Sequence, residues 1–447
     1  MDFAAALQYL DDHINLEATV GGPRAGAVDG LSLDRMRGVV DVLGDPQASA
    51  PVIHITGTNG KGSVAKIVSA LLGAHGLTVG TYGSPHLETI RERISRNVDL
   101  ITELEFADVV SEIAALESLF PDRPSYFDLL TATAFAWFAR EAVEVMVVEV
   151  GLLGRFDSTN VAEADVAVVT NVGKDHTDGV GEWRRSIAEE KAGIIADRSA
   201  VVIGETDPEL VDIFRTEGGA LHWVRDQEFG AFSSAIAVGG RQLGLYTPTT
   251  RLHDLFVPLH GSHQVDNVAV AVAAVEAFFG RPLDPEVVQE ALSAVVVAGR
   301  FEVAHRSPLI VLDSAHNPDG TAAAAATFTE EFEPDGSLTL MVGLLGGRDV
   351  EETLAPLVGL GARRIVCVEA DSPRAVSAVD VASAVSRLVS AGGAPSVPEV
   401  TIVDDIPTAL GRVTDRMESD DALLVAGSTY VVGSARTALR SMNLLTP

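Results

Sequence analysis

Short apolar runs alternate with longer amphipathic stretches along most of this chain. Before about residue 295 the apolar runs fall at Val52–Thr56, Thr78–Tyr82, Val143–Val150, Val166–Asn171 and Ala200–Ile203. Buried strands separated by helical segments are typical of a parallel sheet with crossover helices. The pattern therefore predicts an α/β domain over this part of the chain.

The same alternation starts again after a break near residue 298. The second set of expected strands is Leu309–Asp313, Leu338–Val342, Arg364–Val368, Val400–Val403 and Ala422–Ala426, with helical runs such as Pro318–Phe332 and Val379–Val389. We therefore expect two α/β domains, one over residues 1–297 and one over residues 298–447.

Two stretches depart from this rhythm. Residues 1–50 are acidic and helical in pattern, with a glycine-rich break at Val20–Gly26. Residues 218–258 are polar, with short alternating runs and the turn-like sequence GGRQLG. The second stretch predicts a small β-rich insertion in the first domain.

Composition limits where such a protein works and what it binds. The chain has 447 residues, of which 47% are hydrophobic, and its formal charge is −31. A field of this sign argues against binding nucleic acid or anionic membranes through a general surface. No apolar run reaches the ~18 residues of a membrane-spanning helix, and the acidic start lacks the basic region of a signal peptide. A single cysteine, Cys367, excludes an internal disulfide framework, so we expect a cytoplasmic protein.

The most informative segment is HITGTNGKGSVAKI, residues 54–67. It predicts a strand, a glycine-rich turn and a helix, a geometry that directs backbone N–H groups and a helix N-terminus at a phosphate. The spacing differs from the strict G-x-x-x-x-G-K-[ST] pattern, because Ile55 replaces the first glycine and Gly62 follows Lys61. Nucleotide binding is the favoured interpretation, and an ordinary glycine-rich turn of an α/β fold is the alternative.

Polar side chains follow three further strands of the first domain. Ser84, Glu149 and His176 each come after an expected strand, where open α/β sheets build their sites. A hydroxyl, a carboxylate and an imidazole beside bound phosphates suit Mg²⁺, which usually keeps water and phosphate oxygens as ligands. Taken singly, each has a structural alternative: a turn, a loop cap or a structural histidine.

Lysine is rare in this chain and therefore informative. It occurs only at Lys61, Lys66, Lys174 and Lys191, and all the other residues in the Lys+Arg total are arginine. Lys191 could belong to a solvated Glu-Glu-Lys run on a helix. It could also carry an N-carboxyl group, a carbamate that orients Mg²⁺ and that arginine cannot form, because its guanidinium stays protonated.

The start of the second domain and one late helix of the first add more candidates. Arg300, Asp313 and His316 surround the first strand of the second domain and could meet a nucleotide from across a cleft. Asn267 opens a long helix within HGSHQVDNVAVAVAA, where capping is the alternative reading.

Together these segments resemble the folylpolyglutamate synthase/dihydrofolate synthase enzymes, a family of Mur-type ligases. The matching motifs, in family order, are GTNGKGS, SPHL, EVGLLGRFDSTN, DHT, EKAGI, GRFE, DSAHNP and AGSTYVVG. They span nearly the whole chain, and Gly-Lys-Gly-Ser is this family's form of the phosphate loop. The resemblance implies an α/β fold with a P-loop ATPase domain and small β-rich insertion, followed by a Rossmann-like C-terminal domain.

The resemblance also implies roles for individual residues. ATP would be bound by Asn59, Gly60, Lys61, Gly62, Ser63, Asn267, Arg300, Asp313 and His316. Mg²⁺ would be held by Ser84, Glu149 and His176, with Lys61, His176 and a carboxylated Lys191 in catalytic roles. The pteroate or folate would lie near Tyr126, Phe127, Asp128, Phe156, Asp157 and Ser158.

The implied reaction joins L-glutamate to dihydropteroate, to a reduced folate, or to both, through an acyl phosphate made from ATP. Four departures from the family pattern bear on the acceptor: Lys174, Asp128, Ser314 and the sequence LLGGRD at residues 344–349. Two alternatives stay open, a Mur-type paralogue with another amino acid and carboxylate, and a nucleotide-binding protein without catalysis. The expected partners are small molecules, and the expected state is a monomer.

Overall fold

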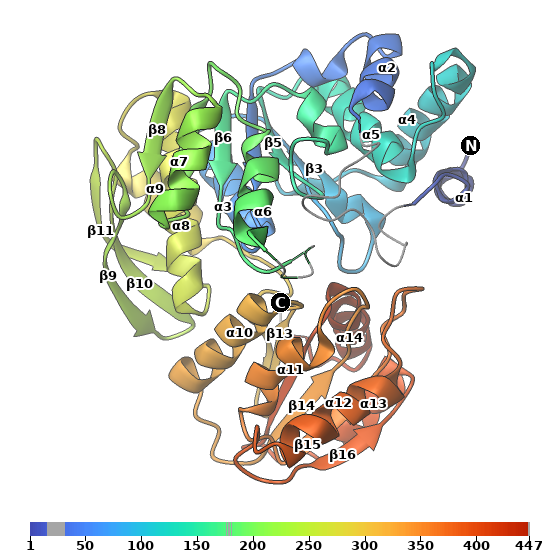
Figure 1. Ribbon diagram of the computed structural model, residues 1–447, viewed down its shortest axis with the longest axis vertical. Coiled ribbons are helices and arrows are strands. Elements are labelled where there is room, and N and C mark those ends of the chain that lie inside the picture. Colours follow the sequence, from blue (N-terminus) through green and yellow to red (C-terminus); the bar gives the residue numbers. More distant parts are fainter. Residues whose placement is uncertain (16–31, 176, 178, 180, 446–447) are drawn as a thin grey trace.

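The computed structural model describes residues 1–15, 32–175, 177, 179 and 181–445. Figure 1 shows two halves, with the N-terminal half above and the C-terminal half below. The predicted break at Val20–Gly26 and the candidate ligand His176 lie outside the described residues.

The N-terminal half is built on a mostly parallel sheet. Its strand order is β4-β3-β2-β5-β1-β6-β7-β8. The strands are β1 Val52–Thr56, β2 Val79–Tyr82, β3 Ile94–Arg96, β4 Asp99–Leu100, β5 Val145–Glu149, β6 Val166–Val169, β7 Ala200–Ile203 and β8 Leu221–Val224. Only β3 and β4 at one edge run antiparallel. All five strands predicted for this half are present, within a few residues of the expected bounds.

Alternation along the strands lets one sheet fill two cores. On β5, Val145 and Val147 join one core while Met146 and Val148 join the other, as the two-residue period of a strand requires. The helices that cover the sheet are α3 Lys61–Ala74, α4 Glu103–Leu116, α5 Tyr126–Arg140, α6 Trp183–Ala192, α7 Pro208–Glu217, α8 Ser262–Phe279 and α9 Pro285–Ser293. The helices α1 Phe3–Asp11 and α2 Asp34–Val42 pack beside α4 and α5.

The β-rich insertion is smaller than the sequence suggested. Strands β9 Gly230–Ala237, β10 Gly240–Tyr246 and β11 Arg251–Val257 form a separate antiparallel sheet. In contrast, β8 pairs in parallel with β7 and extends the large sheet. The prediction was wrong for β8, because its short and partly exposed pattern is that of an edge strand, which pairs on one side only. The segment GGRQLG is also mostly strand, since only its first glycine precedes β10.

The C-terminal half has its own sheet, in the order β12-β13-β17-β14-β15-β16. Its strands are β12 Glu302–Arg306, β13 Leu309–Asp313, β14 Leu338–Val342, β15 Arg364–Cys367, β16 Glu399–Ile402 and β17 Ala422–Ala426. Its helices are α10 Pro318–Glu331, α11 Val350–Val358, α12 Ala378–Ser390, α13 Ile406–Thr414 and α14 Thr429–Ser441. Strand β12 is antiparallel to β13 and was not expected from the sequence. The proposed boundary at residue 298 falls between α9 and β12, so each sheet lies on one side of it.

Candidate active site

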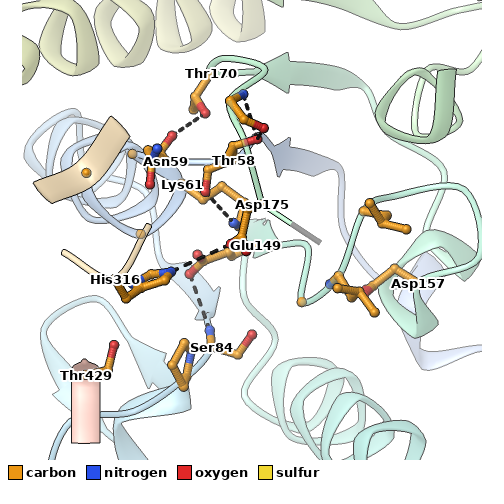
Figure 2. Close-up of a pocket in the computed structure, with 18 of the residues that line it drawn as sticks. Thr58, Asn59, Lys61, Ser84, Glu149, Asp157, Thr170, Asp175, His316 and Thr429 are labelled. Atoms are coloured by element: carbon orange, nitrogen blue, oxygen red, sulfur yellow. Dashed lines mark hydrogen bonds and ion pairs between the residues drawn. The ribbon is translucent and has the colours of Figure 1, made fainter. Parts of the chain in front are cut away.

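A cavity of about 1060 Å³ lies where the two halves meet. Its walls come from the β1–α3 loop, the ends of β5 and β6, the start of α8, and the loops after β13 and β17. Most of the site residues expected from the sequence line it, although they are spread over more than 250 positions of the chain. Figure 2 shows its central part.

Close contacts explain the glycines of the phosphate loop. Gly57 and Gly60 have positive φ angles of 151° and 84°. A Cβ atom on Gly57 would lie 1.8 Å from Thr170 Oγ1, and one on Gly60 would lie 2.4 Å from Asn267 Oδ1. Any larger residue would push the loop away from β6 and α8. The loop therefore has a fixed shape against its neighbours.

Lys61 begins α3 at the floor of the cavity. Its Nζ donates to the carbonyl oxygens of Gly57 at 3.0 Å and Thr58 at 3.4 Å. The lysine amine thus lies over the loop whose N–H groups and helix N-terminus suit an oxyanion. This arrangement supports a phosphate-binding role and disfavours the reading as an ordinary turn.

Glu149 ends β5 directly beside this loop (Figure 2). It is 7% exposed, and a Cβ on Gly62 would lie 3.5 Å from its Oε2 atom. The backbone N–H of Ser84 donates to the same oxygen at 3.3 Å. Burial raises the pKa of the Glu149 carboxyl, while the charges of Lys61 and Arg300 oppose the increase. A buried hard oxygen ligand next to a phosphate loop fits a divalent cation such as Mg²⁺.

The proposed metal ligands are therefore only partly placed. Ser84 and Glu149 lie together, whereas His176 is outside the described residues. Within the described part of the chain no group of three or more His, Cys, Asp or Glu side chains has the geometry to hold a metal ion. A Mg²⁺ bound here would need phosphate oxygens and water to complete its shell.

Lys191 is buried, contrary to the reading as a solvated helix lysine. It lies near the end of α6 and is 4% exposed. Burial lowers its pKa well below the ordinary value, the charge of Lys61 lowers it further, and Asp175 opposes the decrease. A lysine in these surroundings is readily neutral, which is the form that reacts with CO₂.

Several contacts cross between the halves around the phosphate end. The amides of Asn59 and Asn317 exchange two hydrogen bonds, of 2.9 and 3.3 Å. Arg348 binds the Asp175 carboxylate with two hydrogen bonds, of 2.8 and 3.1 Å. His316 also enters from the C-terminal half, with its Nε2 3.8 Å from Asp175 (Figure 2).

The other candidates of the second half lie on the opposite wall. Arg300 and His316 line the cavity, and burial lowers the pKa of His316 despite the nearby Asp175. Asp313 accepts hydrogen bonds from the backbone N–H groups of Phe301 and Ala315, at 2.8 and 2.9 Å. Asp313 thus fixes the backbone on both sides of itself, including the loop that carries Arg300.

Asn267 is not a capping residue. Helix α8 begins after Gly261 with no side-chain cap, and Asn267 lies in its second turn, where its amide donates to Gln264 at 2.9 Å. Its side-chain oxygen lies next to Gly60 of the phosphate loop, since a Cβ atom on Gly60 would be 2.4 Å from it. The capping alternative is therefore wrong for this residue.

Five of the six residues expected at the acceptor site line the cavity: Phe127, Asp128, Phe156, Asp157 and Ser158. Asp128 closes a capping box with Ser125 at the start of α5 and also binds Arg35 at 2.5 Å and Ser158 at 2.6 Å. Tyr126 is the exception, since it is buried in the core beside α1 and α2.

Three residues at the site were not among the sequence candidates. Arg35 lies in α2, far from any recognised motif. Arg348 and Asn317 lie within LLGGRD and DSAHNP, but their contacts with Asp175 and Asn59 depend on how the two halves meet. The sequence pointed to Arg348 and Asn317 only through the two motifs that contain them, and it gave no sign of Arg35. None of the helices in the described ranges is long and apolar enough to span a membrane.

Comparisons with known proteins identify matching domain families and similar proteins. Residues 55–275 match the model of the Mur ligase middle domain, and residues 299–429 match that of the Mur ligase glutamate ligase domain. The chain is 36% identical over 437 residues to the dihydrofolate synthase/folylpolyglutamate synthase of Mycobacterium tuberculosis, with 91% of this chain and 89% of that protein covered.

Solved structures agree over the full length. Folylpolyglutamate synthase of Mycobacterium tuberculosis, complexed with ADP and AMPPCP, has a TM-score of 0.88 and 35% identity, with 98% of each chain covered. A bifunctional folylpolyglutamate synthase/dihydrofolate synthase with Mn, AMPPNP and L-glutamate bound has a TM-score of 0.83 and 29% identity, again with 98% of each chain covered.

Proposed function

The chain belongs to the dihydrofolate synthase/folylpolyglutamate synthase family of Mur-type ligases, and we propose that it uses ATP to join L-glutamate to dihydropteroate, to a reduced folate, or to both. The observation that carries this proposal is the shared cavity. There Lys61, Glu149 and the C-terminal residues Arg300 and His316 meet around one phosphate loop. ATP and a divalent metal ion are the cofactors that this chemistry requires.

In the first step the acceptor carboxylate attacks the γ-phosphorus of ATP and forms an acyl phosphate, with ADP as the leaving group. The loop N–H groups and Lys61 would neutralise charge on the phosphoryl oxygens. Glu149 and Ser84, with His176, would hold Mg²⁺, which when bound withdraws charge from the transferring phosphate. Arg300 and His316 would approach the nucleotide from the opposite wall.

In the second step the glutamate amine attacks the acyl carbon, an amide forms, and phosphate leaves. Water competes with the amine for the same carbon, so the site has to exclude it. Contacts that cross the cavity, such as Asn59–Asn317 and Asp175–Arg348, hold the two halves together during this step.

Lys191 is the proposed site of N⁶-carboxylation. Its neutral amine would add to CO₂ and release one proton, giving a carbamate anion. Two cations nearby, Lys61 and the metal ion, would stabilise that anion. Arginine cannot replace this lysine, since its guanidinium stays protonated.

A direct assay tests the function. Purified protein is incubated with ATP, Mg²⁺, L-glutamate and either 7,8-dihydropteroate or tetrahydrofolate, and phosphate release is compared with the mass of the product. We expect one glutamate added per phosphate for at least one acceptor, and far less product from the Lys61→Ala variant. Phosphate release that depends on the acceptor but is indifferent to glutamate would contradict the proposal.

Two further properties belong to the proposal. We expect a monomer, which size-exclusion chromatography with light scattering would show as a mass near the 46.9 kDa of the chain. We also expect the protein in the cytoplasm, where ATP is available. Fractionation of cells that produce the tagged protein would test the second expectation.

A further inference from the structure

A carboxylate outside the reacting centre forms the most heavily bonded contact between the halves. Glu88 lies in the loop after β2, four residues beyond Ser84, and its carboxylate reaches α14 of the C-terminal half. Arg440 donates from both terminal nitrogens, at 2.5 and 2.8 Å, and the Thr437 hydroxyl donates at 2.8 Å. Arg436 donates as well and also binds Glu302. In Figure 1, α14 lies at the edge of the C-terminal half that faces the N-terminal half.

The backbone around Glu88 packs directly on the same helix. A Cβ on Gly433 would lie 2.0 Å from the carbonyl oxygen of Leu87, so α14 has no room for a side chain there. On the other side of the loop, Glu92 accepts hydrogen bonds from the backbone N–H groups of Leu87, Glu88 and Thr89, at 2.9, 3.0 and 2.9 Å. Residues 87–89 are thus held by Glu92 on one side and by α14 on the other.

The other end of this loop reaches the reacting centre. The N–H of Ser84 donates to Glu149, the carboxylate beside the phosphate loop. Glu88 is only four residues from Ser84 along the chain, so a displacement of Glu88 relative to α14 would be felt at Ser84. None of the motifs quoted above includes Glu88, Arg436 or Arg440.

The anchor is charged over the whole working range of pH. Burial alone would raise the pKa of the Glu88 carboxyl, but hydrogen bonds from Arg440, Thr437 and Arg436 outweigh burial and lower the pKa to about 2. Its side chain is 14% exposed, so salt screens these contacts less than it screens a surface ion pair. The contact is constant near neutral pH and does not act as a pH switch.

We propose that Glu88 is a positioning residue, which fastens the Ser84 loop to α14 and so keeps the cavity closed around the acyl phosphate. This inference rests on the proposed function. Without the anchor, water would reach the acyl carbon, the carboxylate would be regenerated, and phosphate would leave with no amide formed. The expected defect is therefore uncoupling of ATP use from ligation. Ligation itself would continue in part, because Asp175–Arg348 and Lys174–Glu352 also join the halves.

The test compares phosphate released with amide formed in Glu88→Gln and Arg440→Gln variants. In Glu88→Gln, glutamine keeps the size of the side chain and removes its charge. Arg440→Gln shortens the side chain as well as removing its charge, and it leaves the Arg436–Glu302 contact intact. Glu112→Gln is the matched control, because Glu112 pairs with Arg140 inside the N-terminal half and is 65% exposed. Calorimetric binding of Mg-AMPPNP and the melting temperature complete the set.

We expect the wild type and Glu112→Gln to release about one phosphate per amide, and Glu88→Gln to release about three to ten, with Mg-AMPPNP bound about tenfold more weakly. Arg440→Gln should show a smaller defect of the same kind. A folded Glu88→Gln variant with normal coupling and normal nucleotide binding overturns the inference. If Glu88→Gln does not fold, Arg440→Gln decides by the same criterion. Absence of amide from the wild type would count against the proposed function, while nucleotide binding would still judge the anchor.

Discussion

The two ends of the cavity are built from different parts of the chain and from different kinds of side chain. The proposed phosphate end is assembled from both halves of the chain. Lys61 and Arg300 line it together with His316, whose pKa is lowered by burial, around a loop of backbone N–H groups. The end proposed for the acceptor comes from the N-terminal half, and there Asp128 is satisfied by Arg35, Ser125 and Ser158.

Each end would therefore recognise its ligand in a different way. At the proposed phosphate end, the charges of Lys61 and Arg300 act on the buried carboxyl of Glu149. A bound phosphate and a divalent cation would add charges of both signs there. At the acceptor end, the ion pair is already neutralised, so recognition depends on shape and apolar contact with a few fixed polar groups. Substitutions at the first end should therefore reduce turnover, whereas those at the second should change acceptor affinity.

The largest effect is expected from Lys61→Ala. Removal of a charge that faces the transferring phosphate should lower kcat/KM by about 10³-fold while acceptor binding changes little. Steady-state kinetics and calorimetry with the acceptor alone would measure both quantities. Arg198→Ala is the control, since Arg198 is 61% exposed, pairs with Glu163 in the same half and does not line the cavity. An equal loss of kcat/KM in both variants would show that the effect is not specific to the phosphate loop.

The next effect concerns Lys191. We expect Lys191→Ala and Lys191→Arg to lose about 10²-fold in kcat, because neither can form the carbamate. A short carboxylate such as acetate should restore part of the activity of Lys191→Ala by occupying the space left, and should not help Lys191→Arg. Wild-type turnover in the arginine variant would rule out the carbamate. Kinetics with and without added bicarbonate would complete the measurement.

A smaller effect, and one of a different kind, is expected from Arg35→Ala. Loss of the partner of Asp128 should raise the KM of the acceptor by about tenfold, or about 1.4 kcal/mol, with kcat and the KM of ATP nearly unchanged. Arg37→Ala on the same helix is the control, because Arg37 is 64% exposed and pairs only with Asp34 among its described ion pairs. A fall in kcat without a change in acceptor KM would mean that the two ends are not separate.

The smallest effect comes from pH, through Glu149. Burial raises the pKa of this carboxyl in the folded state, so folding favours its protonated form and stability is lost as pH rises through and above the unfolded-state pKa. A bound divalent cation offsets that loss only when the carboxyl is ionised. Mg-AMPPNP should therefore raise the melting temperature by a few degrees more at about pH 7.5 than at about pH 5.5. Thermal scans of the wild type and Glu149→Gln, with and without ligand, would show whether the difference depends on this residue.

Much of the fold could be predicted, because many strands and turns leave a pattern in residues that are neighbours in the sequence. The central strands of both sheets appear as apolar runs, and the β1–α3 loop appears as a glycine cluster, since period and turn chemistry depend on neighbouring residues. Strand β8 was misassigned for the same reason: an edge strand has a weak local pattern, and its place in the sheet depends on β7.

The same distinction between local patterns and long-range contacts applies to the site. The amino-acid sequence by itself determined the two α/β units, the phosphate loop and the motifs of a ligase family, because each is a short pattern with a local physical cause. Only the tertiary structure decided that Lys191 is buried, that Tyr126 lies in a core, that Arg35 binds Asp128, and that Glu88 and Asp175 are bound by arginines of the other half. These facts depend on contacts between residues far apart in the chain, whose burial and charge balance exist only after the two halves have met.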